Sequence, residues 1–385
     1  MNHHSGFRSY HAGRGRPRRL LLGMMATFAM VLGLAGAGAV TAAADTVIDT
    51  VPVGTDPARL AITPNGAFAY VVNNGSDTVS VIDTASNTVV GAPIPVGDGP
   101  AGVAITPNGA FVYVTNNSAG TVSVIDTGTN TVVGAPIPVG PEPFGVAITP
   151  NGAFAYVVNN GDDTVSVIDT GTNMVVGGPI SVDDRPLEVA ITPDGAFAYV
   201  TNFLGDNVSV IDTGTNTEIT TVTVGDGPTG VAITPDGAFA YVTNNGANTV
   251  SVIDTASNTV VGTPIPVGGF PNGVAITPDG SRAYVTNEND GTVSLIDTGA
   301  NMVVQTVTVG NGPFGVAITP DGTRAYVTNF DDATVSVIAI EKCLGSLCIG
   351  FGSLVGGGST GSGGTGSLAG GGSLVGGGSV GSAGS

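Results

Sequence analysis

Short apolar segments alternate with turn residues along most of the chain, and they recur with a regular period. The tripeptide Ile-Thr-Pro occurs seven times at intervals of 42 or 43 residues, each time followed by Asn-Gly or Asp-Gly and by segments rich in Val, Ile, Thr and Tyr. β-branched and aromatic residues favour strands, and Gly, Asn, Asp and Pro favour the turns between them. Four strands per unit at this period are typical of a β-propeller blade. The copies begin at Ile62, Ile105, Ile148, Ile191, Ile233, Ile276 and Ile318.

The second repeat illustrates the four strands that the pattern predicts. They are an innermost strand Gly102–Thr106, then Phe111–Asn116 and Thr121–Asp126, and an outermost strand Asn130–Gly140. All are apolar on both faces, as expected where blades stack face to face. The outermost segment has ten residues where the period is 42 and eleven where it is 43. We expect the extra residue to form a bulge, because an edge strand tolerates one.

The seventh repeat lacks an outermost strand, and the segment that precedes the first repeat supplies one. Residues 45–54 align without a gap on Asn216–Gly225. Pairing the two chain ends would remove a free strand edge and close the ring. The sequence therefore predicts an all-β, seven-bladed propeller of four-stranded antiparallel blades over residues 45–340, closed by the N-terminal strand.

The first 44 residues have the three-part layout of a secretory signal peptide. Basic residues 14–19 precede an uncharged apolar run, Leu20–Val40, and small residues then lead to Ala44. This layout predicts export, with cleavage after Ala44 and no membrane insertion afterwards. An uncleaved anchor is the alternative, since the run is long enough to span a bilayer. The pair Arg18-Arg19 leaves the twin-arginine and the general secretory routes both open.

Removal of that segment changes the charge and the chemistry of the remainder. Five of the ten basic residues and none of the 29 acidic ones precede residue 45, so five basic and 29 acidic residues remain, with a formal charge of −24. Such a surface disfavours nucleic acid and anionic membranes as partners. All three histidines are removed as well. Residues 45–385 therefore exclude Ser-His-Asp and Cys-His catalysis and any metal held by imidazole.

The C-terminal part differs from the repeats in composition. Residues 341–349 contain Cys343 and Cys348, for which an exported chain favours a disulfide over two free thiols. Residues 350–385 consist almost entirely of Gly, Ser, Thr, Leu, Val and Ala. This composition predicts disorder. A flexible tether to the cell envelope and a tail without a role are equally compatible with it.

The strings Ile-Thr-Pro-Asp-Gly, Tyr-Val-Thr-Asn and Val-Ile-Asp-Thr give the repeats a family resemblance. Over residues 45–340 the chain resembles the YVTN β-propeller repeat proteins, which include YncE-like periplasmic proteins and archaeal surface-layer proteins. The resemblance implies an exported propeller. Related propellers include lactonase-like enzymes and subunits of quinoprotein dehydrogenases, and the lactonase-like branch implies basic and histidine groups in a central pocket. The motif stands at Tyr113–Asn116, Tyr199–Asn202, Tyr241–Asn244, Tyr284–Asn287 and Tyr326–Asn329.

Residues that recur in every blade are expected to be structural. A tyrosine at one fixed strand position is interpreted as packing between blades with a partner for its hydroxyl. The aspartates that end the third strand are interpreted as turn caps. The tyrosines are Tyr70, Tyr113, Tyr156, Tyr199, Tyr241, Tyr284 and Tyr326, and the aspartates are Asp83, Asp126, Asp169, Asp212, Asp254 and Asp297.

Candidate ligand-binding residues are those that break the repeat at one mouth of the central channel. Arg59 and Glu188 replace a glycine that starts the innermost strand in five other blades. Loops on the same face add charged and aromatic residues, namely Asp162, Asp163, Asp183, Asp184, Arg185, Phe203 and Phe330. The clustered carboxylates make calcium a possible partner, but no EF-hand-like spacing is present. The sequence predicts no catalytic residue, cofactor or metal site.

These features favour a non-enzymatic binding or scaffold module in the periplasm or at the cell surface. Its partner would be an envelope protein, a glycan or a small ligand. A lactonase-like or quinoprotein-dehydrogenase-associated propeller enzyme is the alternative, with Arg59, Asp183, Arg185 and Glu188 around the channel. A structural protein of a surface layer is a third possibility.

Overall fold

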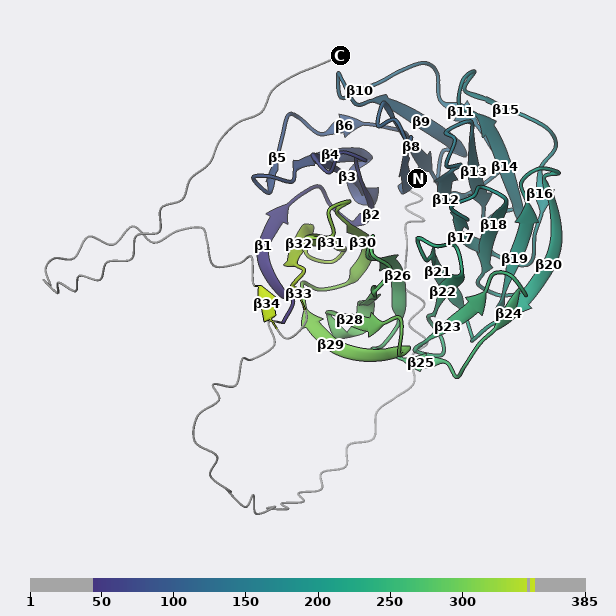
Figure 1. Cartoon of the computed structure of the whole chain (residues 1–385). Helices are drawn as coiled ribbons and strands as arrows, with labels where there is room; N and C mark the ends of the chain where they lie inside the picture. Colours follow the sequence, from purple (N-terminus) through teal and green to yellow (C-terminus); the bar gives the residue numbers. More distant parts are fainter. Residues whose placement is uncertain (1–43, 345–346, 350–385) are drawn as a thin grey trace, which may run out of the picture. The chain divides into compact units, whose positions relative to one another are not determined.

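The chain folds into seven antiparallel β-sheets arranged as blades around one axis (Figure 1). The computed structural model describes residues 44–344 and 347–349. The predicted signal segment and Gly/Ser-rich tail lie outside these residues. Among the described residues, no helix has the length and apolar character needed to cross a membrane. The only helical elements within those residues are two short 3-10 turns, η1 (Asn74–Ser76) and η2 (Glu288–Asp290).

Each blade begins with a strand that faces the axis, and these seven strands contact one another in sequence until the last meets the first. The innermost strands are β2 (Pro57–Ile62), β7 (Pro100–Ile105), β12 (Pro143–Ile148), β17 (Pro186–Ile191), β21 (Pro228–Ile233), β26 (Pro271–Ile276) and β30 (Pro313–Ile318). They begin two residues earlier than the sequence predicts, because the proline pairs with the next strand across a bulge, as between Pro100 and Val103.

The second and third strands follow the predicted bounds in the second repeat. The second strands are β3 (Phe68–Asn73), β8 (Phe111–Asn116), β13 (Phe154–Asn159), β18 (Phe197–Asn202), β22 (Phe239–Asn244), β27 (Arg282–Asn287) and β31 (Arg324–Asn329). The third strands are β4 (Thr78–Asp83), β9 (Thr121–Asp126), β14 (Thr164–Asp169), β19 (Asn207–Asp212), β23 (Thr249–Asp254), β28 (Thr292–Asp297) and β32 (Thr334–Ala339).

The outermost strands are of two kinds, and the predicted position of the bulge is wrong. Ten-residue segments form continuous strands with one bulge, namely β20 (Thr217–Thr223), β29 (Met302–Thr308) and β1 (Thr46–Pro52). Eleven-residue segments break into two short pieces. These are β5 (Thr88–Val89) with β6 (Ile94–Pro95), β10 (Thr131–Val132) with β11 (Ile137–Pro138), β15 (Met174–Val175) with β16 (Ile180–Ser181), and β24 (Thr259–Val260) with β25 (Ile265–Pro266).

The core lies between the blades. One apolar cluster joins Tyr70 and Val72 of the first blade to Val112, Val114 and Ile125 of the second, and equivalent clusters join the other pairs. Each fully buried aliphatic side chain of this kind contributes about 1.5–3 kcal/mol. The stability of the ring therefore comes from many copies of the same contact.

Closure of the ring by the N-terminal strand is confirmed. β1 pairs antiparallel with β32, and Val51 of β1 is buried against the seventh and first blades. After the last blade, β33 (Lys342–Leu344) and β34 (Leu347–Ile349) form a small hairpin. Its register places Cys343 opposite Cys348. Cross-strand neighbours lie at a separation that a disulfide can span, so the pairing remains a prediction with favourable backbone geometry.

Candidate functional site

The site is built on the bulge that starts each innermost strand. In the second blade the bulge contains Gly102, whose amide donates to Thr115 Oγ1 at 2.7 Å. A Cβ on Gly102 would come within 2.2 Å of the Phe144 carbonyl oxygen in the next blade. The close approach of neighbouring innermost strands therefore explains why most blades keep glycine here.

Arg59 and Glu188 occupy this glycine position in the first and fourth blades. Both lie on the bulges, between Pro57 and Leu60 and between Pro186 and Val189. Arg59 Nε lies 2.5 Å from Glu188 Oε2, and the two side chains are only 15% and 17% exposed. A bulge re-aims a side chain relative to a regular strand. The two sequence-predicted residues thus meet across the axis of the ring and bridge two separated blades.

Two aromatic rings flank the guanidinium of Arg59. Its Cζ lies 4.5 Å from the ring centroid of Phe144 and 5.2 Å from that of Phe314. Phe314 also contacts Phe330, with centroids 6.1 Å apart. Phenyl faces stabilise a cation by their quadrupole. Phe144 and Phe314 were not among the residues predicted from the sequence. The available signal was that the residue before the glycine varies from blade to blade.

One hydrogen-bonding group of Arg59 has no partner. Its Nη1 atom is buried and makes no hydrogen bond to any described residue. An unsatisfied buried donor costs roughly 1–3 kcal/mol, more for a charged group. A ligand or water with an acceptor atom would recover that free energy.

The carboxyl group of Glu188 is shifted toward its neutral form. Burial raises the pKa of Glu188, and the nearby Arg59 guanidinium opposes this only in part. The group can therefore accept a proton more readily than an ordinary glutamate. This is the property that a general base or a proton-linked binding group needs.

The acidic residues predicted at the rim are largely engaged with neighbouring loops. Asp163 Oδ1 accepts from the Arg185 amide at 2.9 Å, and Asp162 Oδ1 accepts from Thr164 Oγ1 at 2.8 Å. Asp183 accepts from the Asn207 side chain and from the Asp184 amide. The guanidinium of Arg185 lies 5.9 Å from the ring centroid of Phe203. These residues form a rim beside Glu188, and Asp183 and Asp184 remain exposed.

Several rim residues hold a backbone conformation that favours glycine. Gly99, Gly227 and Gly312 have φ near +63° in the loop before the innermost strand. At the same position Glu142, Arg185 and Phe270 have φ between +50° and +57°, and so does Asp56. Such conformations cost of order 1 kcal/mol in residues with a side chain. The mouth of the ring therefore carries large side chains despite local strain.

The repeated tyrosines and aspartates are structural, as predicted. Tyr70 donates to Asn130 Oδ1 of the next blade at 2.6 Å, and Asp83 Oδ1 accepts from the Ser86 amide at 2.9 Å. Each of these bonds recurs in five other blades. No group of three or more histidine, cysteine, aspartate or glutamate side chains suited to a metal ion occurs among the described residues. Calcium remains a sequence-based hypothesis without a described site.

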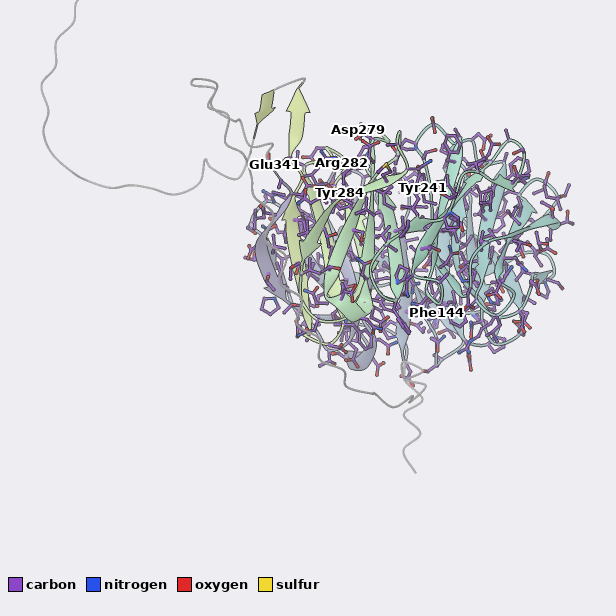
Figure 2. All side chains as sticks on the ribbon, turned by 90° about the horizontal axis from the view of Figure 1, so that it is seen from below. Phe144, Tyr241, Asp279, Arg282, Tyr284 and Glu341 are labelled. Carbon is purple, nitrogen blue, oxygen red and sulfur yellow. The ribbon has the colours of Figure 1, made fainter. Side chains whose placement is uncertain are left out.

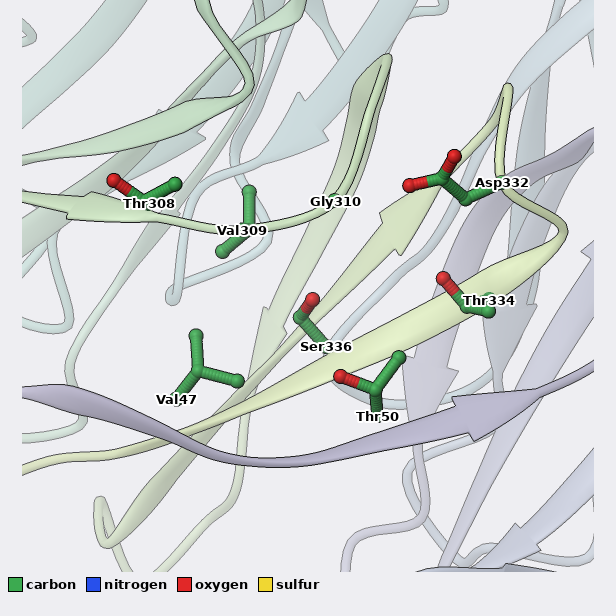
Figure 3. A pocket seen from close by; sticks show the side chains of 8 residues that line it. All are labelled: Val47, Thr50, Thr308, Val309, Gly310, Asp332, Thr334 and Ser336. Carbon is green, nitrogen blue, oxygen red and sulfur yellow. The ribbon is translucent and has the colours of Figure 1, made fainter.

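Two surface hollows lie elsewhere, between outer strands of adjacent blades. One of about 440 Å³ lies where β29, β1 and β32 meet and is lined by Val47, Thr50, Asp332 and Ser336 (Figure 3). Another of about 540 Å³ lies between the broken outer strands of the first two blades. Both are open grooves of the repeat. They lack the paired charges and aromatic rings found at the axis.

The fold and the axial site define a seven-bladed β-propeller whose symmetry is broken by a buried ion pair. The family described as "Lactonase, 7-bladed beta-propeller" matches residues 35–142 and 140–302. The chain belongs to this family.

Solved structures similar to this chain include a propeller-containing protein. A structure titled "Kuenenia stuttgartiensis Hydrazine Synthase" is similar to this chain, with a TM-score of 0.69 and 27% identity. The alignment covers 75% of this chain and 97% of that chain. A search of curated proteins found no match.

Proposed function

We propose that the protein is an exported, non-enzymatic binding module of the YVTN type that holds a neutral sugar at the axis of the ring. The observation that carries this proposal is the buried Arg59 Nη1 without a hydrogen-bond partner, set between Phe144 and Phe314. The export part of the proposal rests on the signal-like layout of residues 1–44.

The charge of the site favours a neutral ligand. Arg59 and Glu188 already neutralise each other at 2.5 Å. Adding a ligand charge to this poorly hydrated position would cost free energy that neither partner could offset. The acidic surface of residues 45–385 further disfavours anions.

The donor, the acceptor and the aromatic rings of the site favour a hydroxylated ligand with an apolar face. Arg59 Nη1 supplies a donor and the Glu188 carboxylate supplies acceptor capacity. Phe314 and Phe330, both half-buried, supply ring surface beside it. A sugar offers hydroxyls that both donate and accept together with C–H faces that pack on aromatic rings.

The experiment is to apply the purified full chain to an array of neutral oligosaccharides, beside its R59G/E188G variant. Glycine stands at this position in five blades, so the variant should keep the fold. We expect wild type to bind a subset of the array and the variant to lose that subset. Absence of any bound sugar, or equal binding by the variant, would refute the proposal.

Hydrolysis of a lactone is the second candidate, favoured by the raised pKa of Glu188 and by the family match. Glu188 would take a proton from water while the water oxygen bonds to the lactone carbonyl carbon. Arg59 Nη1 would donate to the resulting oxyanion. The ring C–O bond would then break, and the leaving oxygen would take the proton from Glu188, giving a hydroxy acid. Lactone opening by wild type that is lost in E188Q would favour this candidate over sugar binding.

A further inference from the structure

A second departure from the repeat lies on the opposite face of the ring, at the junction of the sixth and seventh blades. In six blades the buried tyrosine hydroxyl donates to an asparagine of the following blade, as from Tyr70 to Asn130. Tyr284 instead donates to a carboxylate oxygen of Asp45. Figure 2 shows Arg282, Tyr284 and Glu341 gathered near this junction, well away from Phe144.

Asp45 is held by more groups than any asparagine at the equivalent position. Its side chain is fully buried and lies 3.3 Å from Arg282 Nη1. The Glu341 amide donates to Asp45 Oδ1 at 2.8 Å. Arg282 is itself a departure from the repeat, because five blades have phenylalanine there.

Both backbone polar groups of Asp45 are hydrogen-bonded to the side chain of Gln305. Its amide nitrogen donates to Gln305 Oε1 at 3.1 Å, and its carbonyl accepts from Gln305 Nε2 at 2.6 Å. The preceding residue, Ala44, is exposed. The structure therefore fixes the nitrogen of residue 45 at the boundary between a buried pocket and the surface.

The charges of this pocket do not balance among the described side chains. Asp45 and Glu341 supply two carboxylates, and the cation of Arg282 pairs with Asp45. Glu341 is 8% exposed. Its Oε2 atom is buried and has no hydrogen-bond partner among the described residues. A buried carboxylate without a cation or donors is costly.

We propose that this pocket is the receptor for the α-ammonium group of a chain that begins at Asp45, and that proteolytic maturation thereby completes closure of the ring. This inference rests on the proposed export but not on sugar binding. A signal peptidase would add water across the Ala44–Asp45 peptide bond. The C–N bond breaks, Ala44 leaves with a carboxylate, and the nitrogen of Asp45 becomes an ammonium. That group supplies the second cation and pairs with Glu341, while Gln305 Oε1 keeps one of its protons.

Stability measurements on two forms of the protein, both ending at Ser385, test the proposal. One begins at Asp45, and the matched form keeps Ala43-Ala44, which moves the ammonium group out of the pocket. We expect the form that begins at Asp45 to have a Tm higher by about 2–4 °C. The difference should disappear when both forms carry E341Q. Equal Tm values in wild type, or a difference that persists in E341Q, would overturn the proposal.

The ionisation of the terminal amine gives a second readout that needs no Glu341 variant. An ordinary α-amino group has a pKa of about 7.7–8.0. In the form that begins at Asp45, the carboxylates of Glu341 and Asp45 should raise the pKa of this amine, although Arg282 opposes the shift. The pH dependence of the rate of amine acylation measures that pKa. A pKa at or below the ordinary value would contradict the proposal. N-terminal sequencing of the exported protein should give Asp45, and another first residue would also overturn the proposal, whatever the sugar array shows.

Discussion

Arg59 and Glu188 each stabilise the charge of the other in a position where most blades have no side chain. Their separation of 2.5 Å and their low exposure make them a buried pair rather than a surface salt bridge. Removing one partner of such a pair leaves an uncompensated charge, whereas removing both can be nearly neutral. Two residues from distant parts of the sequence are therefore energetically coupled, and variants can measure that coupling.

Single and double substitutions should behave differently. We expect R59G and E188G each to lower the free energy of unfolding by about 3 kcal/mol, because each strands a buried charge. The R59G/E188G variant should lie within about 1 kcal/mol of wild type, allowing for the backbone entropy of glycine. Denaturant titrations of the four proteins form the cycle. Additive losses in the double variant would show that the two residues do not interact.

The buried tyrosines predict how the ring responds to alkali. Burial, together with the charge of an aspartate in the next blade, raises the pKa of Tyr70, Tyr113 and Tyr156 to about 12. The unfolded chain loses these protons near pH 10. Their stabilising contribution is therefore fully present below pH 10 and is lost as the pH rises toward 12. Tyrosinate absorbance should rise together with the loss of β-sheet circular dichroism; ionisation well before unfolding would contradict this.

At the scale of the strand, one extra residue decides whether the outer edge of a blade is continuous. The broken outer strands turn at a glycine with positive φ, such as Gly177 at +72°. The continuous strands absorb their irregularity in a single bulge instead. Both solutions interrupt a regular edge. Such interruptions limit pairing between edges of different molecules.

Two adjacent glycines in the third blade test this account of the broken strand. An added Cβ meets no atom within 4 Å at Gly177 or at Gly178, but only Gly177 has a positive φ. We expect G177A to lower the free energy of unfolding by about 1 kcal/mol, because an L-residue is strained there. G178A is the matched control and should change it by less than about 0.5 kcal/mol. Equal effects of the two substitutions in thermal unfolding would contradict the explanation.

The repeat made the strands easy to predict and the site difficult. Tyr113 and its equivalents recur at one spacing, so their packing followed from the sequence. The two-residue error at Pro100 arose because the bulge between Pro100 and Val103 contains Gly102, and a proline followed closely by a glycine suggests a turn. The contact between Arg59 and Glu188 could not be predicted, because it depends on how many blades separate the two residues and on the side-chain direction that each bulge sets. Phe144 and Phe314 were missed because a lone aromatic residue on an apolar strand resembles core.

At the scale of the whole molecule, the closed ring separates two exceptions to the repeat. Arg59 and Arg185 lie at the face where the innermost strands begin, and Arg282 and Arg324 begin second strands at the other face. The first exception crosses the axis and leaves a donor unsatisfied. The second anchors the strand that closes the ring. The regular blades thus supply rigidity, and the departures supply the candidate chemistry.

The most direct measurement is calorimetric titration of an array-selected neutral oligosaccharide into wild type, R59G/E188G and E142G. Glu142 is exposed on the same face with φ +50°, so glycine there leaves the axial pair intact and serves as the control. We expect wild type and E142G to bind the oligosaccharide with equal affinity. We expect R59G/E188G to bind it at least about tenfold more weakly, because a hydrogen bond to a charged group is lost. Equal affinity in all three proteins, with the double variant folded, would contradict it.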